Sequence, residues 1–322
     1  MATIEATAAR LAELLLGSRS GLADPTGSDL IFEAEPYLRR LARTTAPPEV
    51  WAVDGGQAMV ADARCLQVVV TRAATVCWSA GRSVLEEEGV LEHHLLGGGE
   101  ERAALAASGA PVAPDAAVDV NLLRDWGEWR AVADAVRRAA PGSLLLVDGD
   151  LQPDWRIGSD WLAALLSDAA ASAITLVGVT KHSSLSRGAT PLLGQLEQEA
   201  AALLGPRAMW WTQVAHTRPD VGDGLRVVMA RFDPDARFAF RVDLPLAAPV
   251  EATLGALSAL CDDAAFPGYP YPLSMADRLA ACPRWLRTEV WELLDEAFDA
   301  AGVDPEVRER AFADRHRLME RG

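Results

Sequence analysis

The sequence predicts an α/β protein, and two observations support this fold class. Short apolar runs of strand length recur at residues 50–53, 143–147 and 174–179. Between these runs, residues 120–139 carry apolar side chains at helical spacing, and residues 159–172 are also predicted to be helical. Strands that alternate with helices along a chain usually form a sheet covered by helices. We therefore expect an α/β core.

The two ends of the chain are predicted to be mostly helical. Residues 2–17 carry apolar side chains at helical spacing, and a second helix is expected over residues 29–44, before Pro47. Towards the other end, helices are expected over residues 250–262, 273–281 and 284–300 and from about Asp304. These segments predict an N-terminal helical segment over 1–48, a core domain over 49–282, and C-terminal helices over 283–322 that pack on the same domain.

Further strands and one loop complete the predicted core. Residues 66–71 and 75–78 are rich in β-branched side chains, which favour strands. Residues 225–232 and 237–242 are expected to pair across a turn that contains Pro234. Residues 97–118 begin with three glycines and are rich in alanine and proline, so they predict a variable loop or insertion.

The composition sets limits on function. The 322 residues carry a net charge of −16, which disfavours free-standing, non-specific DNA binding because phosphates are bound by Lys and Arg. Net charge does not describe the field inside a cleft, however. No apolar run approaches the about 20 residues of a membrane span, and the N-terminus lacks the order of a signal peptide, so we expect a cytoplasmic protein. No CxxC, Walker A or GxGxxG sequence occurs, which argues against a zinc knuckle or nucleotide hydrolysis.

Two apolar strands are followed directly by aspartate and glycine, at Asp54-Gly55 and at Asp148-Gly149, and the first of them is predicted to end in a tight turn at Asp54-Gly55-Gly56. An acid at the carboxyl end of a buried strand lies at the rim of the sheet, where α/β proteins place ligands. Two neighbouring carboxylates repel each other unless a cation lies between them, and oxygen ligands suit Mg²⁺ or Mn²⁺. The alternative is that each Asp-Gly pair only favours a turn after its strand and binds no ligand.

Glu128 supplies a third acid, in the predicted helix 120–139 between Trp126 and Trp129. The flanking aromatic residues indicate a partly buried face, and a buried acid needs a partner. The alternatives are that Glu128 lies on the surface, or that nearby Asp125 takes this role. The order strand-Asp, strands, helix-Glu, strand-Asp is the RNase H-like arrangement, so we expect a mixed β-sheet core flanked by helices.

With these motifs in this order, the chain resembles the NurA family of nucleases. The similar segments, in chain order, are Val53–Gly56, Arg124–Glu128, Leu144–Leu151, Val177–Ser183, Phe240–Asp243 and Gly268–Leu273. They match the family's first Asp-Gly motif, its helix motif, its second strand-Asp-Gly motif, its Gly-Val-Ser-Lys segment, a late Phe-Arg strand and the Tyr-Pro motif. The matches are collinear and span roughly residues 50–280.

The resemblance implies a metal-dependent nuclease that degrades DNA ends as a 5′–3′ exonuclease and cuts single strands. It implies Mn²⁺ or Mg²⁺ as cofactor, with two ions about 3.5–4 Å apart that activate water and stabilise the leaving oxygen. It also implies a homodimer that works in DNA repair with a HerA-like hexameric ATPase. A partner that holds the DNA and drives it into the nuclease would explain how such an acidic chain can act on DNA.

Carried over to this sequence, the resemblance makes Asp54, Glu128 and Asp148 metal ligands. Lys181 would contact the scissile phosphate, the alternative being a surface lysine whose stem covers apolar surface. Tyr271 would line the site, the alternative being an aromatic that packs beside Pro272.

Two departures from the family pattern leave a second hypothesis open. Gly56 stands where most members have serine, and Asp277 stands near the position of a histidine that often follows the Tyr-Pro motif. Aspartate can bind Mn²⁺ or Mg²⁺, so Asp277 is a further candidate ligand, but it is no near-neutral acid or base without a large pKa shift. The alternative function is a catalytically weak NurA-like subunit or interaction module for an ATPase partner. A third possibility is an RNase H-like enzyme that acts on RNA.

Overall fold

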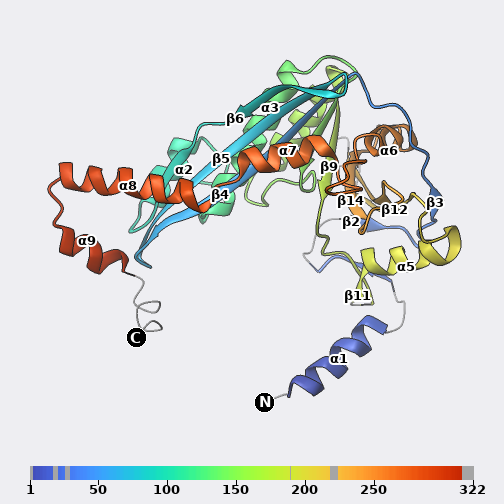
Figure 1. Ribbon diagram of the computed structural model, residues 1–322, viewed down its shortest axis with the longest axis horizontal. Helices are drawn as coiled ribbons and strands as arrows, with labels where there is room; N and C mark the ends of the chain where they lie inside the picture. The colour runs from blue at the N-terminus through green and yellow to red at the C-terminus, as the bar shows by residue number, and fades with distance from the viewer. Residues whose placement is uncertain (1–2, 17–20, 26–29, 189, 218–223, 314–322) are drawn as a thin grey trace.

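The computed structural model describes residues 3–16, 21–25, 30–188, 190–217 and 224–313 (Figure 1). Its main feature is a long mixed sheet with helices on both faces. The strands of this sheet follow the order β2-β12-β13-β14-β9-β8-β4-β5-β6. The predicted α/β class, with a mixed sheet flanked by helices, is confirmed.

Three parallel strands form the centre of the sheet: β4 (Glu49–Asp62), β8 (Leu144–Asp148) and β9 (Thr175–Thr180). They contain the three apolar runs, whose continuous hydrophobicity is explained by burial on both faces. Antiparallel strands extend the sheet beyond β4 through β5 (Leu66–Ser79), β6 (Arg82–Glu88) and β7 (Glu92–Gly97). Beyond β9 they are β14 (Phe240–Pro245), β13 (Leu225–Arg231) and β12 (Trp210–Thr217).

Helices cover both faces of this sheet. The described helices are α1 (Ile4–Leu16), α2 (Glu101–Ser108), α3 (Val120–Arg138), α4 (Ser159–Ala171), α5 (Leu192–Leu204), α6 (Val250–Ser258), α7 (Tyr271–Ala280), α8 (Arg284–Ala300) and α9 (Pro305–Phe312). On one face, α3 and α4 pack on Trp51 and Val53 of β4. On the other, α6 and α7 pack on Val50 and Ala52. Successive residues of β4 therefore point to opposite helical layers.

The helix predicted over residues 29–44 is wrong for the part of it that the structure describes. Residues 30–32 form β2 (Leu30–Phe32), which pairs with β12, and β3 (Arg39–Arg40) pairs with the same strand. Pro36 lies between them and has no amide hydrogen to continue a helix. Pairing with a distant strand outweighed local helical periodicity here, so the segment extends the sheet.

Two other predictions need correction. The tight turn predicted after Asp54 is absent, because β4 continues to Asp62 and pairs with β5 along its length. The loop predicted over 97–118 contains α2, which ends at Gly109 in the left-handed conformation (φ 67°). Beyond these corrections, a second small sheet joins β1 (Leu22–Ala23), β10 (Ser186–Arg187) and β11 (Thr190–Pro191).

Among the described helices, none has the length and apolar character needed to cross a membrane.

The core predicts a sharp contrast between two leucine truncations. Leu146 is fully buried in β8, so Leu146→Ala should lower the free energy of unfolding by about 2–5 kcal/mol through lost burial and a residual cavity. Leu293, 59% exposed on α8, is the matched control, and its alanine variant should change stability by at most about 0.5 kcal/mol. Urea denaturation measures both, and equal losses would contradict this description of the core.

Candidate metal centre

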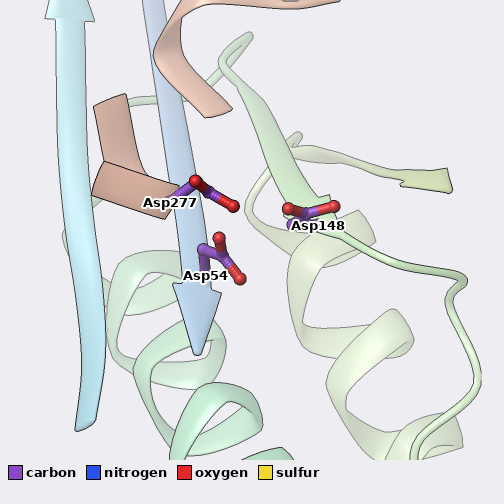
Figure 2. Close-up of side chains that lie close together, drawn as sticks. All are labelled: Asp54, Asp148 and Asp277. Carbon is purple, nitrogen blue, oxygen red and sulfur yellow. The ribbon is translucent and has the colours of Figure 1, made fainter. Parts of the chain in front are cut away.

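Three aspartates from separate elements meet at the rim of the central sheet. Asp54 lies within β4, Asp148 ends β8 and Asp277 lies on α7 (Figure 2). One carboxylate oxygen from each lies within 4.8 Å of the other two. The structure thus brings together three of the predicted site residues from positions far apart in the sequence.

Strand register explains why Asp54 and Asp148 are neighbours. β4 and β8 run parallel, with Val53 opposite Val147, so the two following aspartates lie side by side. β8 ends at Asp148, while β4 continues, which opens the sheet at this level. Because side chains alternate along a strand, both aspartates point to the layer of α7. Pro272 in the first turn of α7 favours the start of that helix, whose second turn carries Asp277 over the two strands.

The close approach of α7 accounts for one departure from the family pattern. A Cβ atom added to Gly56 would lie 1.8 Å from the carbonyl oxygen of Ala280, at the end of α7. Serine at this position would therefore require the helix to move. The absence of a side chain at residue 56 lets α7 lie close enough to bring Asp277 to the two strand aspartates.

The turn after Asp148 is fixed by a buried ion pair from the next part of the sheet. Arg241 and Asp243, both on β14, form two hydrogen bonds of 2.8 Å, and Asp243 is fully buried. Asp243 also accepts a hydrogen bond of 3.3 Å from the backbone nitrogen of Leu151. The Phe-Arg motif thus contributes support for the chain that leaves Asp148, rather than a group in the centre.

Lys181 lies between two of the aspartates, just beyond the end of β9. Its Nζ donates to Asp148 Oδ2 at 2.6 Å and to Asp277 Oδ1 at 3.0 Å. Burial lowers the pKa of Lys181, but hydrogen bonds and charges from both aspartates outweigh it and raise the pKa overall. The ammonium group therefore stays charged and partly neutralises the cluster.

Asp54 is the most strongly perturbed of the three. It is 7% exposed, and its Oδ1 accepts a hydrogen bond of 2.7 Å from the Gly55 amide. Burial, followed by the charges of Asp148 and Asp277, raises the pKa of Asp54 to about 8, although Lys181 and the Gly55 amide oppose the shift. A bound cation would reverse this effect, because it favours the ionised form of each carboxylate.

Tyr269 faces the centre, although the Tyr-Pro motif predicted this position for Tyr271. Its side chain is 2% exposed, and the Lys181 ammonium lies 5.0 Å from the centre of its ring. Burial, followed by the charge of Asp148, raises its pKa. The hydroxyl lies near Asp148, but no described acceptor meets normal hydrogen-bond geometry. This buried hydroxyl is an unused polar group directed towards the site.

Tyr271, the tyrosine predicted to line the site, lies elsewhere. Its ring packs edge-on against Trp78, with the ring centres 5.2 Å apart, and it lines a different hollow that includes Leu260. The two tyrosines of the Tyr-Pro motif have different surroundings because Tyr269 precedes α7 and Tyr271 begins it.

Glu128 is not among the acids that the structure brings together. It is 3% exposed on α3, and a Cβ atom on Gly55 would lie 2.8 Å from its Oε2. Gly55 points to the α3 layer, so Glu128 lies behind β4 with respect to the aspartates. Arg124 pairs with it at 3.6 Å, yet burial, followed by the charge of Asp54, raises the pKa of Glu128 well above its usual value. Asp125, the other candidate, accepts a hydrogen bond of 2.7 Å from the Asp154 amide.

The donors fit a hard divalent cation. Three carboxylates converge on one point at the edge of an open hollow of about 450 Å³, which Arg124, Lys181 and His182 also line. Oxygen-only donors suit Mg²⁺ or Mn²⁺. Burial and the charges of Asp148 and Asp277 raise the pKa of Asp54, and a bound cation would oppose this shift by favouring the ionised carboxylate.

One compositional signal would have singled out this site from the sequence. The chain has 30 basic residues, of which Lys181 is the only lysine. A lysine ammonium is a compact point charge, which suits a position between two carboxylates.

Comparison with known proteins supports the fold. No family model and no curated protein matches the sequence. Among solved structures, the model is similar to the NurA nuclease from Sulfolobus solfataricus, with a TM-score of 0.56 and 15% identity over 83% of this chain and 88% of that one. The chain has the fold of a NurA nuclease. A second NurA structure (TM-score 0.44, 10% identity, 74% and 85% covered) and human ENDOV (0.44, 15%, 78% and 93%) are more weakly similar.

The NurA resemblance inferred from the motifs is thus confirmed as a likeness of fold. At 15% identity the comparison concerns the fold, and the roles of individual residues rest on the geometry of the site.

The raised pKa of Asp54 predicts how stability depends on pH without metal. Between the ordinary aspartate value of about 4 and about 8, the folded state holds a proton that the unfolded state has lost, so stability falls as pH rises through this window. Asp54→Asn should remove this part of the slope, and saturating Mn²⁺ should remove it from the unmodified protein. Thermal unfolding from pH 5 to 9 measures it. An unchanged slope in Asp54→Asn would show that another group causes the dependence.

Proposed function

We propose that this protein is a divalent-metal-dependent deoxyribonuclease that hydrolyses phosphodiester bonds at the aspartate centre. The observation that carries the proposal is the convergence of Asp54, Asp148 and Asp277 beside Lys181 in an open hollow. The fold shared with a NurA nuclease supports the assignment to nucleic-acid hydrolysis.

In this proposal the three aspartates hold Mn²⁺ or Mg²⁺, and two ions would act together as in two-metal nucleases. Bound ions of this type activate water and stabilise the leaving oxygen of an in-line displacement. Lys181 donates to a non-bridging oxygen of the scissile phosphate and neutralises charge that develops there. Arg124 at the mouth of the same hollow binds a neighbouring phosphate. Glu128 lies behind β4, where burial and the charge of Asp54 raise its pKa, and in this proposal it makes no contact with substrate.

We further propose that the enzyme processes DNA ends in repair, as a 5′–3′ exonuclease and single-strand endonuclease, and that it acts in the cytoplasm. The net charge of −16 makes it unsuited to bind long duplex DNA alone. A homodimer working with a HerA-like hexameric ATPase would supply the DNA binding that the acidic chain lacks on its own. The resemblance to the NurA family supports both partnerships.

The proposed function is tested by replacing one ligand. With Mn²⁺, the protein should degrade linear and single-stranded DNA, and Asp148→Asn should lower the rate by at least about 10²-fold, because a neutral amide neither binds the ion well nor balances its charge. Asp160→Asn, on the exposed start of α4, is the matched control and should keep full activity. A gel assay with a labelled oligonucleotide measures the rates, and circular dichroism confirms folding.

The second hypothesis, a catalytically weak subunit for an ATPase partner, is motivated by Asp277 in place of the family's histidine. A calorimetric Mn²⁺ titration separates the two. Binding together with DNA cleavage supports the nuclease. No binding at millimolar Mn²⁺ and no cleavage support the weak subunit. Cleavage of RNA but not DNA would support the RNA-directed alternative.

Lys181 should have opposite effects on metal binding and on catalysis. Lys181→Gln removes a positive charge next to the ligands, so Mn²⁺ affinity should rise by about tenfold, since a unit charge about 4 Å away contributes at least about 1 kcal/mol. Turnover should fall by about 10²-fold, because the charge on the phosphate is no longer neutralised. Calorimetry and kinetics measure the two effects, with Lys181→Arg as the charge-conserving control. Loss of metal binding together with activity would show that Lys181 only maintains the fold of the site.

A further inference from the structure

Two separate hollows follow one another along β4, from the metal centre towards the tip of the β4–β5 hairpin. The metal-centre hollow includes Gly56 and Gln57 of β4 and ends at Cys282, just before α8. A second hollow, of about 470 Å³, follows at Met59 and Val60 of the same strand. Its other wall consists of residues from α8, namely Arg284, Arg287, Thr288 and Trp291. We call the second hollow, with these six residues, the β4–α8 groove.

The groove wall is one flank of α8. Positions 284, 287, 288 and 291 recur at intervals of three and four, so they share one side of the helix. A second side packs on the sheet through Leu286 and Val290, which contact Ala58. The glutamates of α8 fall on a third side, at Glu289, Glu292 and Glu296. The arginines of α8 therefore lie towards the groove and its glutamates away from it, while Asp295 and Asp299 pair with Arg308.

The two groove arginines have free guanidinium groups. Neither Arg284 nor Arg287 forms an ion pair or a side-chain hydrogen bond with any residue that the structure describes, and both are exposed. Elsewhere in this acidic chain, arginines commonly pair with carboxylates, as Arg138 does with Glu87 and Asp134. Two adjacent unpaired cations in a chain of net charge −16 indicate a site for an external anion.

Trp291 adds an aromatic surface beside these cations. Its ring is partly buried and is held edge-on by Phe312 of α9, with the ring centres 5.6 Å apart. An aromatic side chain next to cations that track a backbone is the combination by which proteins bind single strands, because unpaired bases stack on the ring. A duplex would keep its bases stacked internally, so the groove favours a single strand.

On this evidence we propose that the β4–α8 groove binds the single DNA strand that runs from the metal centre towards the hairpin tip. Arg284 and Arg287 contact successive phosphates, and a base stacks on Trp291. At about 3.3 Å per residue, Met59 lies about 17 Å along β4 from Asp54, within reach of a strand of a few nucleotides. The inference rests on the proposed function and deepens it, since it names the form of DNA and the path that it takes.

The test measures DNA binding without metal, so that cleavage plays no part. The variant R284Q/R287Q of the full chain is titrated with fluorescent oligodeoxythymidine in EDTA at several salt concentrations. For single strands the slope of log affinity against log salt changes by about 0.7 for each phosphate contact, so the double variant should lose about 1.4 from the slope. The single variant R287Q should lose about half as much, which keeps the test open if the double variant is unstable.

The matched control is R82Q/R237Q, which removes the same charge from two exposed arginines outside the groove. Its slope should equal that of the unmodified protein. Equal slopes for the groove variant and the control would overturn the proposal, because net charge alone would then explain the binding. A change of the groove variant in oligomeric mass by light scattering, with an unchanged slope, would also overturn it and assign the groove to protein contact.

The failure of this proposal is distinguishable from failure of the proposed function. An unmodified protein that binds the oligonucleotide with the groove-dependent slope but cleaves no DNA with Mn²⁺ would keep the groove and refute the nuclease. If the protein cleaves DNA with Mn²⁺ but the salt dependence of its binding is the same with and without Arg284 and Arg287, only the groove proposal is refuted.

Discussion

Mutual repulsion among three carboxylates is the constraint on which the rest of the site depends. Asp54, Asp148 and Asp277 lie within one ion's reach of each other, and Asp54 is almost fully buried. Such an arrangement is unfavourable unless positive charge lies between the groups. Lys181 supplies part of that charge, while burial, followed by the charges of Asp148 and Asp277, still raises the pKa of Asp54. The parallel register of β4 and β8 holds Asp54 and Asp148 together against this repulsion, and the packing of α7 holds Asp277 beside them.

The sequence predicted the parts of the site that follow from strand periodicity. Asp54 and Asp148 each end an apolar run, and in parallel neighbours that pattern places the side chains together. Glu128 was harder, because helical periodicity shows that a residue is buried but not on which side of a distant strand it lies. Whether it reaches the aspartates depends on the packing of α3 beneath β4, a tertiary contact with no local signal in the sequence.

Errors elsewhere have the same origin. Tyr269 and Tyr271 belong to one motif, and only the exact start of α7 decides which of them faces the aspartates. The segment around Pro36 has helical periodicity but joins the sheet, because β12 offers unpaired backbone groups. Asp277 was identified as a candidate ligand from its place after the Tyr-Pro motif, whereas its contact with Lys181 depends on Gly56 admitting α7. Sequence patterns therefore predicted where the candidate site lies, while close packing between layers determines which side chains meet there.

The position of Lys181 has a practical consequence for handling the protein. Most proteins carry many surface lysines, so most of the label from an active ester, or most attachments to an aldehyde surface, lie away from the functional site. In this chain, apart from the terminal amine, such reagents have one target, and it lies between two carboxylates of the candidate metal centre. Amine-directed labelling would therefore modify the centre itself. The exposed thiol of Cys65 lies at a distance along β4 and β5, but the free thiol of Cys282 lines the hollow at the centre, so labelling at Cys65 requires that Cys282 be replaced first. A lysine-specific protease would likewise find its single cleavage position there, so resistance to that protease reports directly on the integrity of the site.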